Sequence, residues 1–144
     1  MADGKRRPAA RPCPSCPYRL DAPPGLWAAD EYDKLPLYDL DTAGQAEAGM
    51  FGVFCCHTDP GRLCAGWVAT IDLDESLALR VNHARVDLDA VRAYRSPVPL
   101  HPSGQAAADH GRAGLAGPPS PATVAKGAQV ARMIARRGRR GDVR

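Results

Sequence analysis

The sequence contains no long hydrophobic run. No stretch approaches the roughly 20 consecutive apolar residues that a membrane-spanning helix requires, so we expect no membrane segment. The basic N-terminal stretch, residues 1–8, is not followed by an apolar segment and therefore lacks the features of a secretory signal. No segment is repeated along the chain. Because neither a membrane segment nor a secretory signal is expected, we predict a cytoplasmic protein.

The chain also has little material for a large hydrophobic core. Its 144 residues suffice for one domain with tails, and 14 glycines and 14 prolines interrupt the segments that could pack. Small cores commonly need a disulfide set or a bound metal. The five cysteines are an odd number, which argues against a framework of disulfides alone. In the cytosol thiols stay reduced, so this cysteine pattern indicates metal binding or catalysis.

The cysteines fall into two groups that are far apart in the chain. The first is Cys13-Pro-Ser-Cys16, a turn that aims two sulfurs at one point and is typical of half of a zinc site. In the second, Cys56 and Cys64 flank an Asp-Pro-Gly turn that should bring them together. Structural zinc sites need four ligands, so we predict that these four cysteines form one site that joins the two segments. The competing interpretation is a set of free buried thiols.

Two neighbours of Cys56 complicate this assignment. On a β-strand, adjacent side chains point to opposite faces, so we predict Cys56 as the ligand and Cys55 as a small buried hydrophobic residue. His57 could replace one thiol in a Cys₃His site, or it could donate a hydrogen bond to a ligand. The remaining histidines are expected to be surface residues: His83, His101 and His110.

Hydrophobic periodicity and turn residues predict mostly short helices. We expect helices over residues 27–35, 62–71, 73–81 and 87–95, a helical turn over 103–110 and a longer helix over 121–138. The best strand candidate, residues 50–57, is bulky and β-prone. The expected fold is a small α-rich (α+β), metal-stapled domain with short helices, one short β element and flexible basic termini.

The helix over residues 121–138 has the clearest signals. Ser120 is a favourable N-cap, Pro121 a favourable first residue, and Gly138 should lie just past the end. Its apolar stripe consists of Val124, Ala128, Ala131, Ile134 and Ala135. The helix over 73–81 should begin at a capping box of Asp72 and Glu75 and carry a stripe of Leu73, Leu77 and Val81.

The same signals divide the chain into segments. We expect a disordered basic arm (1–12), a Cys-cluster metal-binding domain (13–95), a Pro/Gly/Ala-rich connector (96–120), a basic amphipathic C-terminal helix (121–138) and a tail (139–144). Residues 96–144 carry eight basic and two acidic side chains, whereas residues 20–60 carry one basic and eight acidic. Basic ends of this kind suit a nucleic acid or an acidic protein surface. The candidate contacts are Arg132, Arg136, Arg137, Arg139 and Arg140.

These features favour a small zinc-binding interaction module over an enzyme. An iron–sulfur redox sensor or electron carrier is the first alternative, because four cysteines hold either group. A thiol–disulfide enzyme at Cys13–Cys16 is a further alternative, but that motif normally follows a strand and opens a helix, and here Pro17 follows it. A hydrolytic zinc site is disfavoured because four thiolates leave no open position on the metal.

A series of short motifs along the chain resembles one known family. The motifs are Cys-Pro-Ser-Cys-Pro-Tyr-Arg19, Pro24-Gly25-Leu-Trp27, Glu31-Tyr32-Asp-Lys34-Leu35, Phe54-Cys-Cys-His57, Cys64-Ala-Gly-Trp67 and Leu77-Ala-Leu-Arg80. Together they are similar to domain-of-unknown-function family 6283, which is found in actinobacterial and phage-encoded proteins. The resemblance implies that Cys13, Cys16, Cys56, His57 and Cys64 are family positions and that Cys55 is an addition. It implies no reaction.

Overall fold

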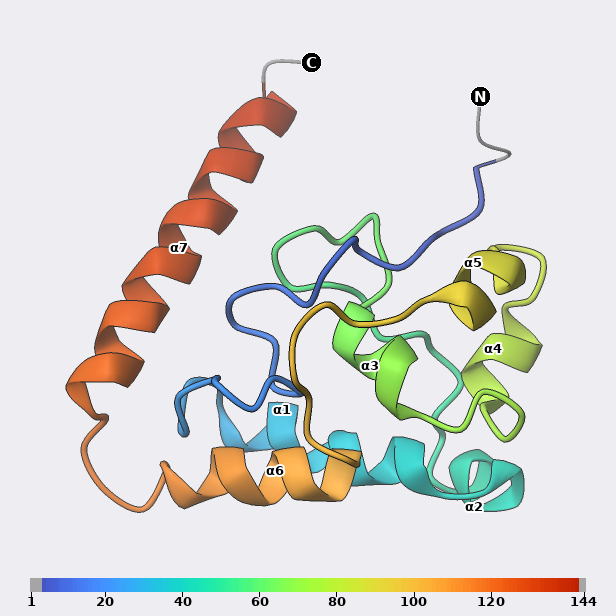
Figure 1. Ribbon diagram of the computed structural model, residues 1–144, viewed down its shortest axis with the longest axis horizontal. Helices are drawn as coiled ribbons and strands as arrows, with labels where there is room; N and C mark the ends of the chain where they lie inside the picture. The colour runs from blue at the N-terminus through green and yellow to red at the C-terminus, as the bar shows by residue number, and fades with distance from the viewer. Residues whose placement is uncertain (1–3, 143–144) are drawn as a thin grey trace.

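The computed structural model describes residues 4–142, with side chains through Arg136. In this range the regular structure is helical (Figure 1). The elements are α1 (Ala29–Asp33), the 3₁₀ helix η1 (Leu35–Asp39), α2 (Thr42–Glu47), α3 (Ala65–Thr70), α4 (Leu77–Val81), α5 (Leu88–Ala93), α6 (Gly104–Ala113) and α7 (Pro121–Asp142). Extended pairing in the same range is limited to four isolated β-bridges. The prediction of a small, mostly helical protein is confirmed.

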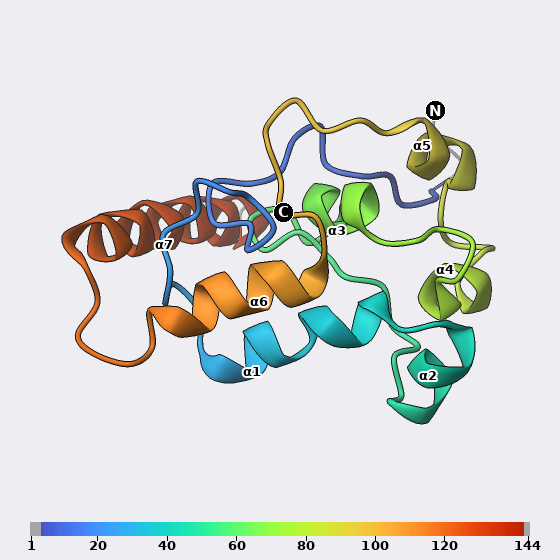
Figure 2. The same cartoon turned by 60° about the horizontal axis from the view of Figure 1, so that its bottom comes forward.

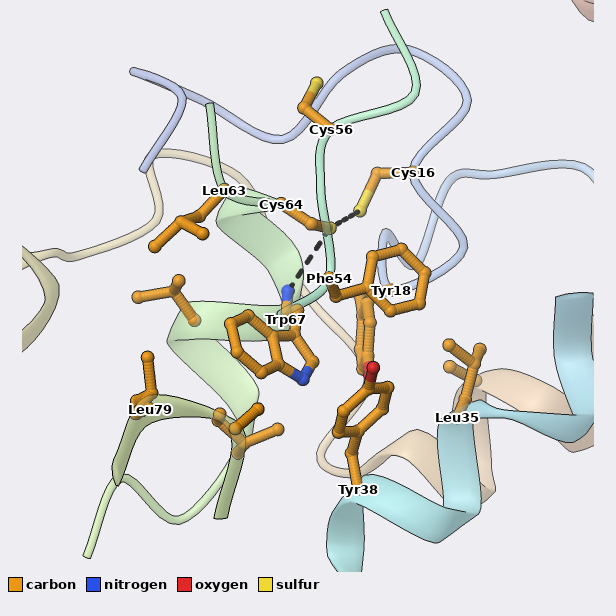
Figure 3. Packing of buried hydrophobic residues seen from close by; sticks show 14 of the residues in the cluster. Cys16, Tyr18, Leu35, Tyr38, Phe54, Cys56, Leu63, Cys64, Trp67 and Leu79 are labelled. Atoms are coloured by element: carbon orange, nitrogen blue, oxygen red, sulfur yellow. Dashed lines mark hydrogen bonds between the residues drawn. The ribbon is translucent and has the colours of Figure 1, made fainter. Parts of the chain in front are cut away.

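The core is built around α3 and a group of aromatic side chains (Figure 3). Trp67 of α3 is fully buried, and Tyr38 of η1 packs edge-on against it with ring centroids 5.4 Å apart. Phe54 lies edge-on to both Tyr38 and Tyr18. The buried cysteines belong to the same cluster, so the thiols lie within the hydrophobic core.

Helix α6 packs on α1 and η1, and this corrects the expectation of a connector over residues 96–120 (Figure 2). A Cβ at Gly111 would overlap the ring of Tyr32, and a Cβ at Gly104 would overlap the Leu35 carbonyl. Asp39 accepts hydrogen bonds from the first two backbone N–H groups of α6, at 2.9 and 2.8 Å. Small residues therefore let α6 approach closely, and a composition that suggests a linker forms part of the core.

The basic arm is ordered where the structure describes it, so the expected disorder over residues 1–12 is wrong for residues 6–9. Parallel bridges join Arg6 to Val86 and Pro8 to Leu63. Four backbone hydrogen bonds of 2.8–3.0 Å tie the arm to the residues around these two bridges. The arm is thus held by its backbone beside two buried residues, Leu63 and Val86, although it carries almost no apolar side chains of its own.

The strand predicted over residues 50–57 is wrong. The only bridge in this segment pairs Cys55 with Leu63, and the remainder is irregular. No neighbouring strand is present in residues 4–142 to extend the pairing, and an isolated two-stranded pair is marginally stable in water. Bulky β-prone residues are used here to cover the aromatic core instead.

Several predicted helix starts are confirmed. Ser103 caps α6 and Asp87 caps α5, each by accepting a backbone N–H three residues later. Ser120 accepts the Thr123 N–H at the start of α7. Helix α3 is also present, but its N-cap is Cys64, so it begins later than expected from residues 62–71.

Other boundaries differ from the expectation. The helix expected over 73–81 is only α4, which is capped by Ser76, because Glu75 accepts hydrogen bonds from Thr42 of α2 instead of closing a capping box. Val81 is 54% exposed, so the expected stripe is buried only in part, at Leu73 and Leu77. The helix expected over 27–35 is split into α1 and η1, and Pro36 lies at the start of η1.

Helix α7 lies along one side of the domain in both views (Figures 1 and 2). It begins at Pro121 as predicted, but it continues past Gly138 to Asp142. The apolar stripe predicted on this helix faces solvent, since Val124 is 58% and Ile134 45% exposed. No helix in the described part of the chain combines the length and hydrophobicity needed to cross a membrane.

Candidate metal centre

The first thiol pair lies on a tight Cys-Pro-Ser-Cys turn. The Cys16 N–H donates to the Cys13 carbonyl at 2.9 Å, and the Arg19 N–H donates to the Cys16 carbonyl at 3.1 Å. Trp27 Nε1 donates to the Ser15 carbonyl at 2.9 Å and holds the turn from outside. Cys13 is 8% exposed and Cys16 is fully buried, so the turn presents both thiols to the interior.

The second thiol pair flanks a loop that two backbone hydrogen bonds close. The Cys56 N–H donates to the Arg62 carbonyl at 2.9 Å, and the Cys64 N–H donates to the Phe54 carbonyl at 2.8 Å. The Arg62 N–H in turn donates to the Asp59 carbonyl, which forms the turn predicted at Asp-Pro-Gly. Both cysteines are buried, and Cys64 is also the N-cap of α3.

Each sulfur of the first turn lies beside a sulfur of the second segment. Cys16 Sγ and Cys64 Sγ are 3.7 Å apart (Figure 3). Cys13 and Cys56 are close enough for each thiol to shift the pKa of the other. The structure thus brings together all four predicted ligands, in two pairs that each join distant parts of the chain.

Within each pair, the contact between the thiols shifts the pKa values of the two partners in opposite directions. The Cys13 thiol lowers the pKa of Cys56 to about 5, and the Cys56 thiol, with burial, raises the pKa of Cys13 above its ordinary value. In the other pair, the bond with Cys64 lowers the pKa of Cys16, and the bond and burial raise that of Cys64. One sulfur in each pair, Cys16 or Cys56, therefore carries negative charge more readily than its partner.

Backbone N–H groups also point at the sulfurs. Beyond the thiol–thiol contacts, such donors lower the pKa of Cys16 and of Cys56, and one lies 3.5 Å from Cys64 Sγ. The donors belong to Tyr18 and Gly66 for Cys16, to Thr58 and Asp59 for Cys56, and to Trp67 for Cys64. N–H groups in these positions stabilise thiolates.

The donor set suits a soft divalent ion. Tetrahedral zinc with Zn–S bonds of about 2.3 Å places ligand sulfurs about 3.8 Å apart, close to the 3.7 Å between Cys16 and Cys64. However, no group of three or more Cys, His, Asp or Glu side chains in the described range is arranged so that it could hold a metal ion. The thiols are gathered as two pairs, of which Cys16–Cys64 is within hydrogen-bond distance, and coordination by four sulfurs stays a prediction.

His57 is held by Glu31 and by aromatic rings. Its Nε2 lies 2.5 Å from Glu31 Oε1, and its ring stacks on Trp27 with centroids 4.3 Å apart. Hydrogen bonds from His57 and Lys34 lower the pKa of Glu31 to about 2. The other ring nitrogen, Nδ1, is buried and has no hydrogen-bond partner among the described residues. The role of His57 as an alternative ligand stays a prediction.

Cys55 is not the buried core residue that strand alternation predicted. It is half-buried, and Arg6 Nη1 donates to its sulfur at 2.8 Å. It lines a pocket of about 360 Å³ together with Lys34, Tyr38 and His57. Cys55 and Cys56 do have different surroundings, but Cys55 faces this pocket because the segment is not a strand with a core face.

Sequence reasoning did not assign a role to Gly66 or to the contact between Glu31 and His57. A Cβ at Gly66 would lie 2.5 Å from Cys16 Sγ and 2.7 Å from Tyr18 Cβ, so glycine alone fits beside the thiols. The glycine in Cys64-Ala-Gly-Trp67 is a visible signal in the sequence. No local pattern connects Glu31 with His57, because the two residues meet only through the tertiary fold.

A second pocket of about 430 Å³ opens beside Cys13 and Cys56. Its walls come from residues 9–12, from Arg19 and from Met133 of α7. Neither Cys16 nor Cys64 lines it. Cys56 also lines the pocket beside Cys55, so it borders both hollows.

The arginines predicted to contact nucleic acid belong to α7 and the residues after it. Arg132 and Arg136 are exposed on this helix. The side chains of Arg137, Arg139 and Arg140 lie outside the part of the chain that the structure describes.

The predicted surface histidines have different surroundings. His83 is exposed, whereas His101 and His110 are half-buried with ring centroids 5.0 Å apart. His110 Nε2 donates to the Ala22 carbonyl at 2.7 Å. The last two therefore belong to the packing of α6 rather than to a free surface.

Comparison with known proteins identifies a family but no activity. No curated protein and no solved structure matches the chain. The sequence model of one family, described as a family of unknown function, matches residues 8–137, which includes both thiol segments and most of α7. The match therefore covers the candidate site as well as the fold. The chain belongs to this family, DUF6283.

Proposed function

We propose that this chain is a small metal-binding interaction domain in which one zinc ion joins the Cys13–Cys16 turn to the loop between Cys56 and Cys64. One observation carries the proposal: four buried cysteines from distant segments meet in two pairs, with Cys16 Sγ 3.7 Å from Cys64 Sγ. Thiols are weak hydrogen-bond donors and acceptors, so gathering four of them has little advantage without an ion.

The surroundings of the sulfurs support this reading. Zinc binds thiolates, and the backbone N–H groups beside Cys16 and Cys56 stabilise negative charge there. Gly66 leaves the space that the Cys16 sulfur occupies. Four thiolates fill the coordination sphere of zinc, so the ion would be structural and would supply folding free energy when bound.

Elemental analysis of the purified chain tests the metal. We expect about one zinc ion per chain for wild type and for Cys55→Ser, and loss of the ion in Cys16→Ser. The two variants should differ because Cys16 belongs to a thiol pair and Cys55 does not. Cys55→Ser is a matched control, since it removes a neighbouring half-buried thiol. Equal loss in both variants would refute the ligand assignment. Metal-free wild-type protein, purified under reducing conditions, would refute the site.

An iron–sulfur cluster is the second candidate, because the donor set consists only of cysteine sulfurs. Protein purified without oxygen would then contain iron and sulfide and would absorb visible light, whereas the zinc form would be colourless. A thiol–disulfide enzyme is disfavoured because Cys13 and Cys16 each face a cysteine of the other segment.

The interaction role is inferred from the charge of α7. Between Asp109 and Asp142 the sequence has no acidic residue, and Arg132 and Arg136 are exposed on the helix. Such a helix suits phosphates, or else an acidic protein surface. Titration of a labelled DNA duplex at rising salt tests the first partner: we expect binding that weakens with salt and a smaller salt dependence in Arg132→Gln/Arg136→Gln. No binding of the duplex at low salt would refute a nucleic-acid partner. Binding to polyglutamate but not to the duplex would identify an acidic protein surface as the partner.

A further inference from the structure

A groove on the surface of α4 and α5 is not part of the thiol centre. One part of it is a pocket of about 350 Å³ with a partly aliphatic lining. The aliphatic residues of the lining are Leu73, Leu79, Leu88 and Val91, of which Leu79 and Val91 are buried. Pockets for small ligands commonly have this size and such a mainly apolar lining.

A second pocket of about 430 Å³ continues the groove towards α3. Leu73, Val91 and Arg92 line both pockets, so the two hollows meet at these residues. The second hollow is also largely aliphatic, with Val68, Ile71, Val98 and Leu100 in its walls. We call the two pockets together the Leu73–Arg92 groove.

The side chains that line the first pocket include two arginines and one carboxylate. The arginines are Arg80 and Arg92, and the carboxylate is that of Asp74. Arg80 is already engaged, because its Nη2 donates to the Asp74 carbonyl at 2.5 Å. The guanidinium of Arg92 has no hydrogen bond or ion pair with any described residue and lies where the two hollows meet.

We propose that the Leu73–Arg92 groove binds a medium-chain aliphatic carboxylate, with its carboxylate on Arg92 and its hydrocarbon chain in the adjoining hollow. An arginine fork pairs with a carboxylate through two parallel hydrogen bonds, and such charged bonds are stronger than neutral ones. A neutral apolar ligand would leave Arg92 without a partner, and an amine would be repelled by it. The groove therefore selects both for an apolar chain and for negative charge.

Calorimetric titration of the purified full chain with hexanoate, octanoate and decanoate tests this proposal. Burial of each additional methylene should strengthen binding by about fourfold, until the chain fills the hollow. Octanol and octylamine have the same chain length without the negative charge, and we expect each to bind about tenfold more weakly than octanoate. Equal binding of octanoate and octanol, or no binding of any carboxylate at millimolar concentration, would overturn the proposal.

Two variants connect the binding to the groove. Arg92→Gln should weaken octanoate binding about tenfold and leave octanol binding unchanged. Arg85→Gln is the matched control, because Arg85 is an exposed arginine between α4 and α5 that does not line either pocket. Equal weakening in both variants would show that general positive charge attracts the ligand and would refute the assignment of Arg92. Thermal unfolding of each variant confirms that it is folded.

Discussion

At the scale of single residues, the thiol centre depends on the space and charge around each sulfur. Cys16 lies against Gly66, and its sulfur is within hydrogen-bond distance of Cys64. On the other side of the centre, Cys56 is followed by His57, which is held by the carboxylate of Glu31. Gly66 and Glu31 are not candidate ligands, yet each supports a residue next to the sulfurs, so each gives a measurable prediction.

Gly66→Ala should destabilise the protein because the new Cβ would lie 2.5 Å from Cys16 Sγ. Relief of the overlap must move either the sulfur or the backbone of α3, and overpacking of a core typically costs about 1–3 kcal/mol. Urea unfolding measures the change in the free energy of unfolding. Gly52→Ala is the control, since nothing lies within 4 Å of a Cβ at that position. Similar stability of the two variants would contradict the close packing described for Gly66.

Glu31→Gln should destabilise the protein at neutral pH but not in acid. The pKa of Glu31 is about 2 in the folded protein, below its ordinary value of 4.5, because His57 and Lys34 bind the carboxylate. The resulting stability is present above pH 4.5 and is lost as the pH falls towards 2. With a side chain that is 19% exposed, we expect a loss of about 1–2 kcal/mol at pH 7.

Urea unfolding at pH 7 and at pH 3, for wild type and for Glu31→Gln, measures this dependence. The difference between the two proteins should shrink at the lower pH. Glu47→Gln is the control, because Glu47 is exposed and is a partner in none of the described side-chain contacts. A difference of the same size at both pH values would mean that Glu31 acts through packing and not through its charge.

At the scale of elements, local signals could be predicted and contacts between distant segments could not. Ser103 and Asp87 were predictable as caps because each bonds to a backbone N–H three residues away. Glu75 failed as a cap because Thr42, far away in the chain, uses its carboxylate. The same local sequence allows Glu75 either to close a capping box or to bond to a distant residue. Only the structure shows which of the two occurs.

The candidate site shows the same division. The Cys13–Cys16 turn and the loop between Cys56 and Cys64 were predictable from short spacings and turn residues. Which sulfurs pair across the two segments was not, since that depends on how the chain passes around the aromatic core. The position of Cys55 was predicted wrongly because strand alternation applies only where a strand forms.

The cap of α6 is an element-scale contact that can be tested by itself. Asp39 of η1 accepts the N–H groups of Gly104 and Gln105, so it fixes the start of α6 from another element. Asp39→Ala should lower the free energy of unfolding by about 1–2 kcal/mol. Asp89→Ala is the control, because it removes an exposed carboxylate from the first turn of α5 that is a partner in no described contact. Equal losses would show that helix charge, and not this hydrogen bond, sets the stability.

At the scale of the whole molecule, short elements are held together by contacts between distant segments. Helix α6 packs on α1 and η1, the two thiol pairs join the first turn to the loop before α3, and the arm pairs with residues next to α3 and α5. Most of the helices have ten residues or fewer, which is too short to be stable alone in water. We therefore expect each contact between distant segments to make its own contribution to the free energy of unfolding, so that removal of one contact leaves the others in place.

Deletion of residues 1–9 separates the contribution of the arm from that of the thiol centre. The arm supplies backbone hydrogen bonds to Leu63, Arg85 and Asp87, each worth about 1 kcal/mol net, partly offset by the entropy of ordering the arm. We expect a loss of about 2 kcal/mol in urea unfolding and unchanged metal content, because all four cysteines remain in place. Arg7→Gln removes only a half-exposed ion pair with Asp87 and should change little. If the deletion abolished metal binding as well, the arm and the thiol centre would form one cooperative unit, and the expectation of separate contributions would be wrong.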